Sequence, residues 1–163
     1  MLVKSNSLIL LVEDCEEDVL FFKNALKRSG LGNPFQIVRD GVDALSYLTG
    51  QFQFTDRNAF PSPGILLLDL TLPKLSGWDV LQWVRSRSRF DNLVVIVLTA
   101  SLRAEDLTRA YQLGADSFLN KPCDPHDLRN LAKAFPERWH NLPDSVELDS
   151  EELSEAGLHP FGS

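Results

Sequence analysis

The sequence contains only two cysteines among its 163 residues, Cys15 and Cys123. Neither belongs to a Cys-x-x-Cys pair or to a cluster with histidine at the spacing of metal ligands, so the sequence predicts neither a disulfide framework nor a zinc site. We expect both thiols to be reduced. The fold predicted below brings both residues near one edge, which leaves a redox link between them as the alternative.

Long hydrophobic runs are also missing. No stretch approaches the roughly 20 apolar residues that a membrane-spanning helix needs. Residues 1–6 lack the charged and then apolar layout of a secretory signal. These absences predict a cytoplasmic protein with no membrane partner.

Positive charge is scarce at the C-terminal end. Residues 137–163 hold seven acidic residues and one base, Arg138, so this segment carries −6 of the total net charge of −7. Residues 1–136 therefore carry −1 and lack the dense basic surface that supplies most of the affinity for nucleic acids, so no DNA partner is expected. Length and composition predict one folded domain over residues 1–136 and an acidic C-terminal tail over residues 137–163.

What the sequence does contain is short apolar runs that alternate with helical patterns. The runs predict strands buried on both faces, and the segments between them place apolar residues at helical spacing. We expect strands at 8–12, 35–38, 65–69, 93–98 and 116–119, and helices at 16–29, 41–49, 78–84, 103–113 and 125–135. Five such alternations predict an α/β fold, a (βα)5 chain with a doubly wound parallel five-stranded sheet.

Residues 51–63 break this alternation. The segment contains Phe52, Phe54 and Phe60 without a clear period, and Pro61 and Pro63 disfavour both helix and strand. We predict a long loop whose aromatic residues hold it against the body of the protein. A surface for a partner is the alternative.

The side chains that end the predicted strands define a candidate site. Parallel sheets bring the carboxyl ends of their strands to one edge, which gathers Glu13, Asp14, Asp69, Thr99 and Lys121 around one crevice. The three carboxylates, with the backbone carbonyl of Thr71, supply the hard oxygen ligands that Mg²⁺ prefers. Asp69 can then act as a nucleophile towards a phosphoryl group. The Thr99 hydroxyl and the Lys121 ammonium are suited to contact the phosphate oxygens.

Each of these residues also has an ordinary explanation when taken alone. Asp14 could be the N-cap of the next helix, Thr99 an ordinary strand residue and Lys121 a surface lysine. The combination favours a phosphoryl-transfer site, because four of the five strands end in a group with a role in the same reaction.

At these residues the chain resembles the receiver domain of two-component response regulators, over residues 7 to about 136. The matching motifs are Leu11-Val12-Glu13-Asp14, Leu67-Leu68-Asp69-Leu70 with Pro73 and Gly77, Leu98-Thr99-Ala100, and Asn120-Lys121-Pro122.

The resemblance implies a flavodoxin-like strand order of 2-1-3-4-5 and a phosphoacceptor switch rather than an enzyme. It implies that Asp69 accepts a phosphoryl group from the phosphohistidine of a sensor histidine kinase, that Glu13 and Asp14 bind Mg²⁺, and that Thr99 and Lys121 contact the phosphate. The aromatic switch position of the family falls on Phe118, for which burial favours the inward side-chain conformation. The alternative is that Phe118 is simply a core residue of its strand. Output would pass to a downstream protein partner or a phosphorelay protein, with homodimerisation through the fourth helix, fifth strand and fifth helix as a further candidate.

Within this family, the loop 51–63, the continuation Leu72-Pro73-Lys74-Leu75-Ser76-Gly77-Trp78 and the expected single domain are most similar to the regulators associated with bacterial phytochromes. A phytochrome is therefore the candidate kinase.

Two other functions are considered. A phosphatase of the haloacid dehalogenase type also uses an aspartate nucleophile with Mg²⁺, but it needs a second aspartate two residues later, where this chain has Thr71. A constitutive interaction module would bind partners without phosphorylation, although the presence of all five site residues argues against it.

Overall fold

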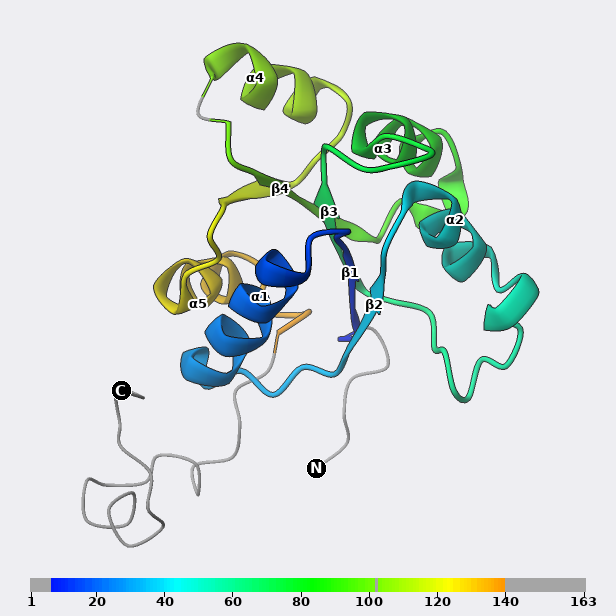
Figure 1. The fold of residues 1–163 in the computed structure, drawn as a ribbon, viewed down its shortest axis with the longest axis horizontal. Coiled ribbons are helices and arrows are strands. Elements are labelled where there is room, and N and C mark those ends of the chain that lie inside the picture. Colours follow the sequence, from blue (N-terminus) through cyan, green and yellow to red (C-terminus); the bar gives the residue numbers. More distant parts are fainter. Residues whose placement is uncertain (1–6, 102, 140–163) are drawn as a thin grey trace, which may run out of the picture.

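The computed structural model describes residues 7–101 and 103–139. Within these residues, five β-strands alternate with five α-helices, as Figure 1 shows. The strands are β1 (Ile9–Val12), β2 (Phe35–Val38), β3 (Ile65–Asp69), β4 (Val94–Thr99) and β5 (Ser117–Asn120). The α-helices are α1 (Glu16–Ser29), α2 (Gly41–Thr49), α3 (Gly77–Arg85), α4 (Ala104–Gln112) and α5 (Pro125–Ala134), and two short 3₁₀ helices are η1 (Phe52–Phe54) and η2 (Ser88–Phe90).

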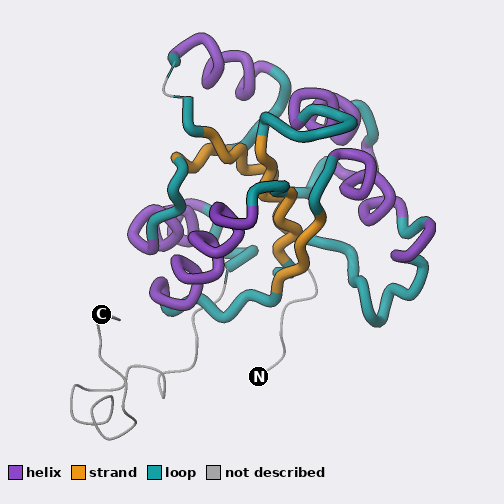
Figure 2. The backbone as a smooth tube through the Cα atoms, in the orientation of Figure 1, coloured by secondary structure: helices purple, strands orange, loops and turns teal. Residues whose placement is uncertain are grey.

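The strands form one parallel sheet in the order β2-β1-β3-β4-β5, which confirms the predicted topology. Figure 2 shows the strands at the centre of the molecule with the helices around them. The register pairs Val12 with Leu68 and Asp69 with Leu98. It therefore brings the ends of β1, β3 and β4 to the same edge.

Two hydrophobic cores lie on opposite faces of the sheet. Leu66 and Leu68 of β3 belong to the core that α2 and α3 cover, whereas Ile65 and Leu67 belong to the core that α1 and α5 cover. This division follows from the alternation of side chains along a strand. Figure 1 shows α1 and α5 together on one side of the sheet and α2 and α3 on the other. Burial on both faces explains why the strand sequences are continuously apolar.

The N-terminal ends of the helices show which acidic residues cap a helix and which do not. Asp40 caps α2 by accepting a hydrogen bond from the Asp43 N–H, and Asp124 caps α5 ahead of Pro125, as predicted. Helix α1 begins one residue later than an Asp14 cap would require. Its N-cap is Cys15, which makes no side-chain capping bond. The explanation of Asp14 as a helix cap is therefore wrong, and its carboxylate is free for another role.

The loop 51–63 is held to the body by aromatic side chains, as one of the two interpretations predicted. The ring of Phe54 lies 5.0 Å from Tyr47 and 5.2 Å from Phe60, between ring centroids. The Tyr47 hydroxyl donates a hydrogen bond to the carbonyl of Pro61. Phe52, in contrast, is 75% exposed.

The described chain continues past the expected domain end at residue 136. Trp139 is only 4% exposed and belongs to the core under α1 and α5. The carbonyl of Arg138, the residue before Trp139, accepts a hydrogen bond from the Asn33 side-chain amide at 2.8 Å. The rest of the predicted acidic tail, residues 140–163, lies outside the described residues. In the part of the chain that the structure describes, no helix has the length and apolar character needed to cross a membrane.

Replacing Phe54 with alanine is expected to lower the free energy of unfolding by about 3 kcal/mol, because the ring is 7% exposed and its loss leaves a cavity. Chemical denaturation measures the change. Phe52→Ala is the matched control and should alter stability by less than about 0.5 kcal/mol, since that ring already faces solvent. Equal losses in the two variants would contradict the packing described for this loop.

Candidate functional site

Three carboxylates meet at the carboxyl edge of the sheet. Glu13 and Asp14 follow β1 and Asp69 ends β3, and one ligand atom from each lies within 4.8 Å of the others. Glu13 is 1% exposed and Asp69 5%, whereas Asp14 is exposed. The structure thus brings together the three acids that the sequence predicted, two of them buried.

Lys121 reaches into this acidic cluster from the end of β5. Its ammonium nitrogen lies 2.7 Å from Glu13 Oε2 and 2.9 Å from Asp69 Oδ2. Burial alone would lower the pKa of Lys121, but its contacts with Glu13 and Asp69 outweigh burial and raise it. The ammonium therefore stays charged and offsets part of the repulsion between the acids.

The pKa of Glu13 is raised first by burial and only then by the neighbouring acid. Burial, followed by the neighbouring Asp69, raises its pKa to about 7, although Lys121 and the Cys15 N–H act in the opposite direction. Cys15 donates to Oε1 at 3.1 Å. Oε2 is buried and has no hydrogen bond of good geometry, although the Lys121 ammonium lies beside it.

Backbone groups fix the position of Asp69. The Thr71 N–H donates to Asp69 Oδ1 at 3.0 Å. Gly77, at the start of α3, approaches so closely that a Cβ there would collide with the Asp69 carbonyl oxygen and lie 2.6 Å from the Leu70 Cα. A residue without a side chain is therefore required at Gly77. The role of the Thr71 carbonyl as a metal ligand stays a prediction.

Thr99 ends β4 beside this cluster but is not hydrogen-bonded to it. Its Oγ1 accepts a hydrogen bond from the Ser101 N–H at 2.9 Å and lies 3.5 Å from the Ser101 carbonyl. The Ser101 hydroxyl in turn donates to Asp106 of α4 at 2.8 Å. Thr99 is thus connected to α4 through Ser101, a link that sequence reasoning missed because it depends on the course of one loop.

Phe118, the predicted switch residue, lies in β5 and is half-buried against the core that α2 and α3 cover. Its ring packs edge to face against Tyr111 of α4, with the ring centroids 6.4 Å apart. The ring therefore connects β5 to α4, and its role as a switch stays a prediction.

Sequence reasoning also missed Asp18, whose Oδ2 accepts a hydrogen bond from Lys121 at 3.2 Å. Asp18 lies in the first turn of α1, whereas Asp14 precedes that helix. Helical spacing therefore does not relate the two residues, and the contact of Asp18 with Lys121 depends on the direction in which α1 leaves the sheet.

The site fits a divalent cation. Four carboxylates and one ammonium leave a net negative charge in a largely buried cluster, and all the ligand atoms on offer are hard oxygens. The buried Glu13 Oε2 is paired with the Lys121 ammonium at 2.7 Å and accepts no hydrogen bond of good geometry, so it is one candidate ligand atom. Glu13, Asp14 and Asp69 are the residues that could hold the ion.

The fold and this site define a class of protein. Residues 9–133 match the response regulator receiver domain family, and the chain belongs to that family. Its members are two-component signalling proteins that are phosphorylated on aspartate.

Individual relatives show which members of the family this chain resembles. Response regulator Rcp1 of Synechocystis sp. is 32% identical over 131 residues, which cover 80% of this chain and 87% of Rcp1. The crystal structure of its Mn²⁺-bound form matches with a TM-score of 0.67 and 31% identity, over 84% of this chain and 99% of that one.

Two further solved structures are associated with phytochromes. The bacteriophytochrome response regulator RtBRR matches with a TM-score of 0.71 and 33% identity, over 94% of this chain and 97% of that one. The phosphorylated cyanobacterial phytochrome response regulator RcpA matches with a TM-score of 0.67 and 30% identity, over 85% and 99%. The predicted resemblance to phytochrome-associated regulators is confirmed.

The two cysteines are free thiols in different environments. Cys15 is exposed. Burial, followed by the negative charges of Asp127 and Asp124, raises the pKa of Cys123 to about 12. We expect iodoacetamide at about pH 8 to alkylate Cys123 at least about 100-fold more slowly than Cys15, because only the thiolate reacts. Peptide mass mapping over time measures both rates.

The control for this experiment is the unfolded chain, in which both thiols should react at similar rates. Equal rates in the folded protein would contradict the burial of Cys123. Resistance of both thiols until a reductant is added would instead support the redox link.

Proposed function

We propose that this chain acts as a response regulator in which Asp69 accepts a phosphoryl group from the phosphohistidine of a sensor kinase. One observation carries the proposal: Asp69 is buried at the end of the central strand, between two other acids and the Lys121 ammonium. This arrangement offers a nucleophilic oxygen and a nearby cation in one place. The similarity to RtBRR and RcpA supports a phytochrome as the kinase.

Glu13, Asp14 and Asp69, with the Thr71 carbonyl, are the proposed ligands of a Mg²⁺ ion. When bound, the ion supplies positive charge that favours the approach of an anionic phosphoryl group to a carboxylate. The Mn²⁺-bound form of Rcp1 supports this assignment, as does the convergence of three carboxylates within 4.8 Å.

The transfer itself forms one bond and breaks another. An Asp69 oxygen bonds to phosphorus while the bond between phosphorus and the histidine nitrogen breaks. The departing imidazole takes up a proton from solvent and leaves as a neutral base. Asp69 Oδ1 is held by the Thr71 N–H, and Oδ2 faces Lys121. The Lys121 ammonium, already 2.9 Å from Oδ2, is placed to bind an oxygen of the new phosphoryl group.

The proposed switch depends on whether the Thr99 hydroxyl contacts Ser101 or the phosphoryl group. A phosphoryl group adds nearly two negative charges and three strong acceptors. The Thr99 hydroxyl would turn from Ser101 towards this acceptor, and the change would pass to α4 through the bond between Ser101 and Asp106. Phe118 would move into the vacated space and change its contact with Tyr111. If the free energies of the two packing arrangements differ by only a few kcal/mol, one modification is enough to reverse which arrangement is favoured.

Output is proposed to pass through protein contacts on α4, β5 and α5, with a downstream partner, a phosphorelay protein or a second copy of the chain. Among the described residues of α4, only Ala110 is fully buried, so this helix has few core contacts to resist a shift. The expected domain end at residue 136 moves in this proposal to residue 139, because Trp139 is buried in the core, and the acidic tail follows it.

Incubation with a small acyl phosphate and Mg²⁺ is expected to add one phosphoryl group to the parent protein, and Asp69→Asn should abolish the addition because no carboxylate remains in that position. Intact mass measures the product. Asp91→Asn, at an exposed carboxylate away from the cluster, is the matched control and should be modified as the parent is.

Modification of Asp69→Asn to the parent extent would refute the assignment. Catalytic turnover of a generic phosphomonoester would support the phosphatase instead. Identical partner binding by the parent and by Asp69→Asn would support the constitutive interaction module.

Mg²⁺ affinity should depend on pH through Glu13. The pKa of this residue is raised to about 7 in the metal-free protein, so the carboxylate is ionised above that pH and protonated below it. A proton competes with the ion, so affinity should fall about tenfold between about pH 8 and about pH 6. Isothermal titration calorimetry measures it.

Glu13→Gln is the control for this dependence. The variant should bind Mg²⁺ more weakly at about pH 8 and show a much flatter response to pH. The same slope in both proteins would mean that another group controls the binding.

A further inference from the structure

A basic cleft lies at the edge of the sheet opposite Asp69. It has a volume of about 820 Å³, and its lining includes Gly64 and Leu93, the residues just before β3 and β4. Three arginines from distant parts of the chain also line it: Arg57 in the loop 51–63, Arg89 in η2, and Arg138 after α5. The phosphoacceptor site does not use these residues.

The three guanidinium groups are positioned by carbonyl oxygens rather than by acids. Arg57 and Arg89 both donate to the Leu48 carbonyl, at 3.1 and 3.2 Å, and Arg138 donates to the Asn92 carbonyl at 2.6 Å. The ion pairs found within residues 7–101 and 103–139 include none of the three. Two like charges that share one acceptor repel each other, and an anion between them would relieve that repulsion.

The chain itself supplies a matching anion. Residues 140–163 contain six acidic residues and no lysine or arginine, and all six lie within residues 144–155. We propose that residues 144–155 bind in this basic cleft of their own chain.

The cleft lies within reach of this segment, because Glu137 and Arg138 line it. The described residues end at Trp139, and the tail begins at the next residue. Five residues of extended chain span up to about 17 Å, enough to bring Asp144 back over the cleft. Each guanidinium has five N–H donors, of which the carbonyl contacts use only some, so further donors remain for carboxylates. Attachment to the same chain gives the segment a high effective concentration, so weak ion pairs suffice.

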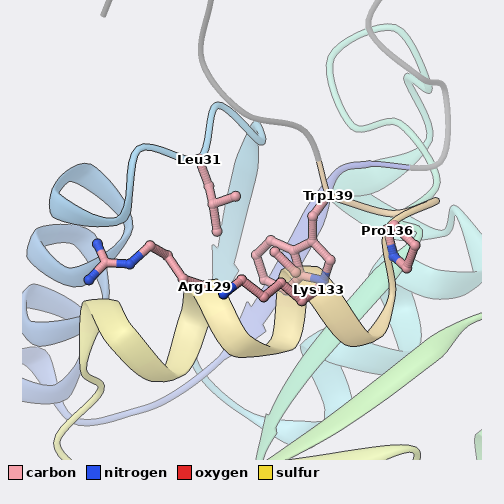
Figure 3. A pocket seen from close by; sticks show the side chains of 6 residues that line it. Leu31, Arg129, Lys133, Pro136 and Trp139 are labelled. Atoms are coloured by element: carbon pink, nitrogen blue, oxygen red, sulfur yellow. The ribbon is translucent and has the colours of Figure 1, made fainter. Parts of the chain in front are cut away.

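A second hollow beside the same exit point provides a matched comparison. It measures about 330 Å³ and is lined by Leu31, Arg129, Lys133, Pro136 and Trp139, which Figure 3 shows, together with Ala132. Figure 3 shows the Arg129 side chain extending along α5 away from Trp139. The second hollow has two cations and mainly apolar walls. The cleft has three arginines and one acid, Glu137, among more polar walls, so the acidic segment fits the cleft better.

Hydrogen exchange of the full chain tests the proposal. At low salt, the amides of residues 144–155 should exchange about fivefold or more slowly than in an unstructured peptide, as expected for several weak ion pairs formed within one chain. Protection should be lost in Arg57→Gln/Arg89→Gln and at about 1 M salt, where screening shortens the range of charge interactions to about 3 Å. Arg129→Gln/Lys133→Gln removes the same charge from the other hollow and should keep the protection.

Three outcomes would overturn the proposal. The first is exchange of residues 144–155 at the unstructured rate in the parent protein at low salt. The second is equal loss of protection in the two double variants. The third is protection that increases with protein concentration, which would mean that the segment binds a second copy. Exchange of the β1 and β3 amides serves as the folding control, and it should be unchanged in both variants.

Discussion

The contact of one ammonium with three carboxylates holds the functional edge of this protein together. Lys121 reaches Glu13, Asp18 and Asp69, which come from two strand ends and one helix. Without it, two buried acids would face each other with no nearby cation, and each would favour protonation of the other. Even with this lysine beside it, the pKa of Glu13 is raised, mainly by burial and then by the neighbouring Asp69. The site therefore holds its acids close together yet retains an affinity for further positive charge.

Most of the fold and the main site residues could be predicted, because residues that end apolar runs in the sequence lie together at the carboxyl edge of a parallel sheet. Asp69 ends the most apolar run, and the register places the ends of β1 and β4 beside it. The residues that were missed depend on other geometry. Asp18 joins the site through the direction of a helix, Ser101 through the course of a loop, and Trp139 through packing after the last helix. Periodicity does not specify these contacts.

The helices are anchored to the sheet to different extents. Within the described residues, α1 buries five of its side chains, whereas α4 buries only Ala110. The contacts of α4 with the strand ends include the bond from Ser101 to Asp106 and the ring contact between Tyr111 and Phe118. A helix held by a few specific contacts can shift when one of them changes, whereas a helix held by a broad apolar face resists movement. The fold thus combines helices with a broad buried face, such as α1, with α4, which only a few contacts hold.

The different exposure of the site residues has a consequence for access. Glu13, Asp69 and Thr99 are buried, while Asp14, Thr71 and Asn120 are exposed. In the proposed reaction, the phosphorus of a donor would have to reach a carboxylate that is only 5% exposed. A phosphoryl group carried on a slender side chain, such as an imidazole, suits such a depth better than one carried on a broad, flat molecule.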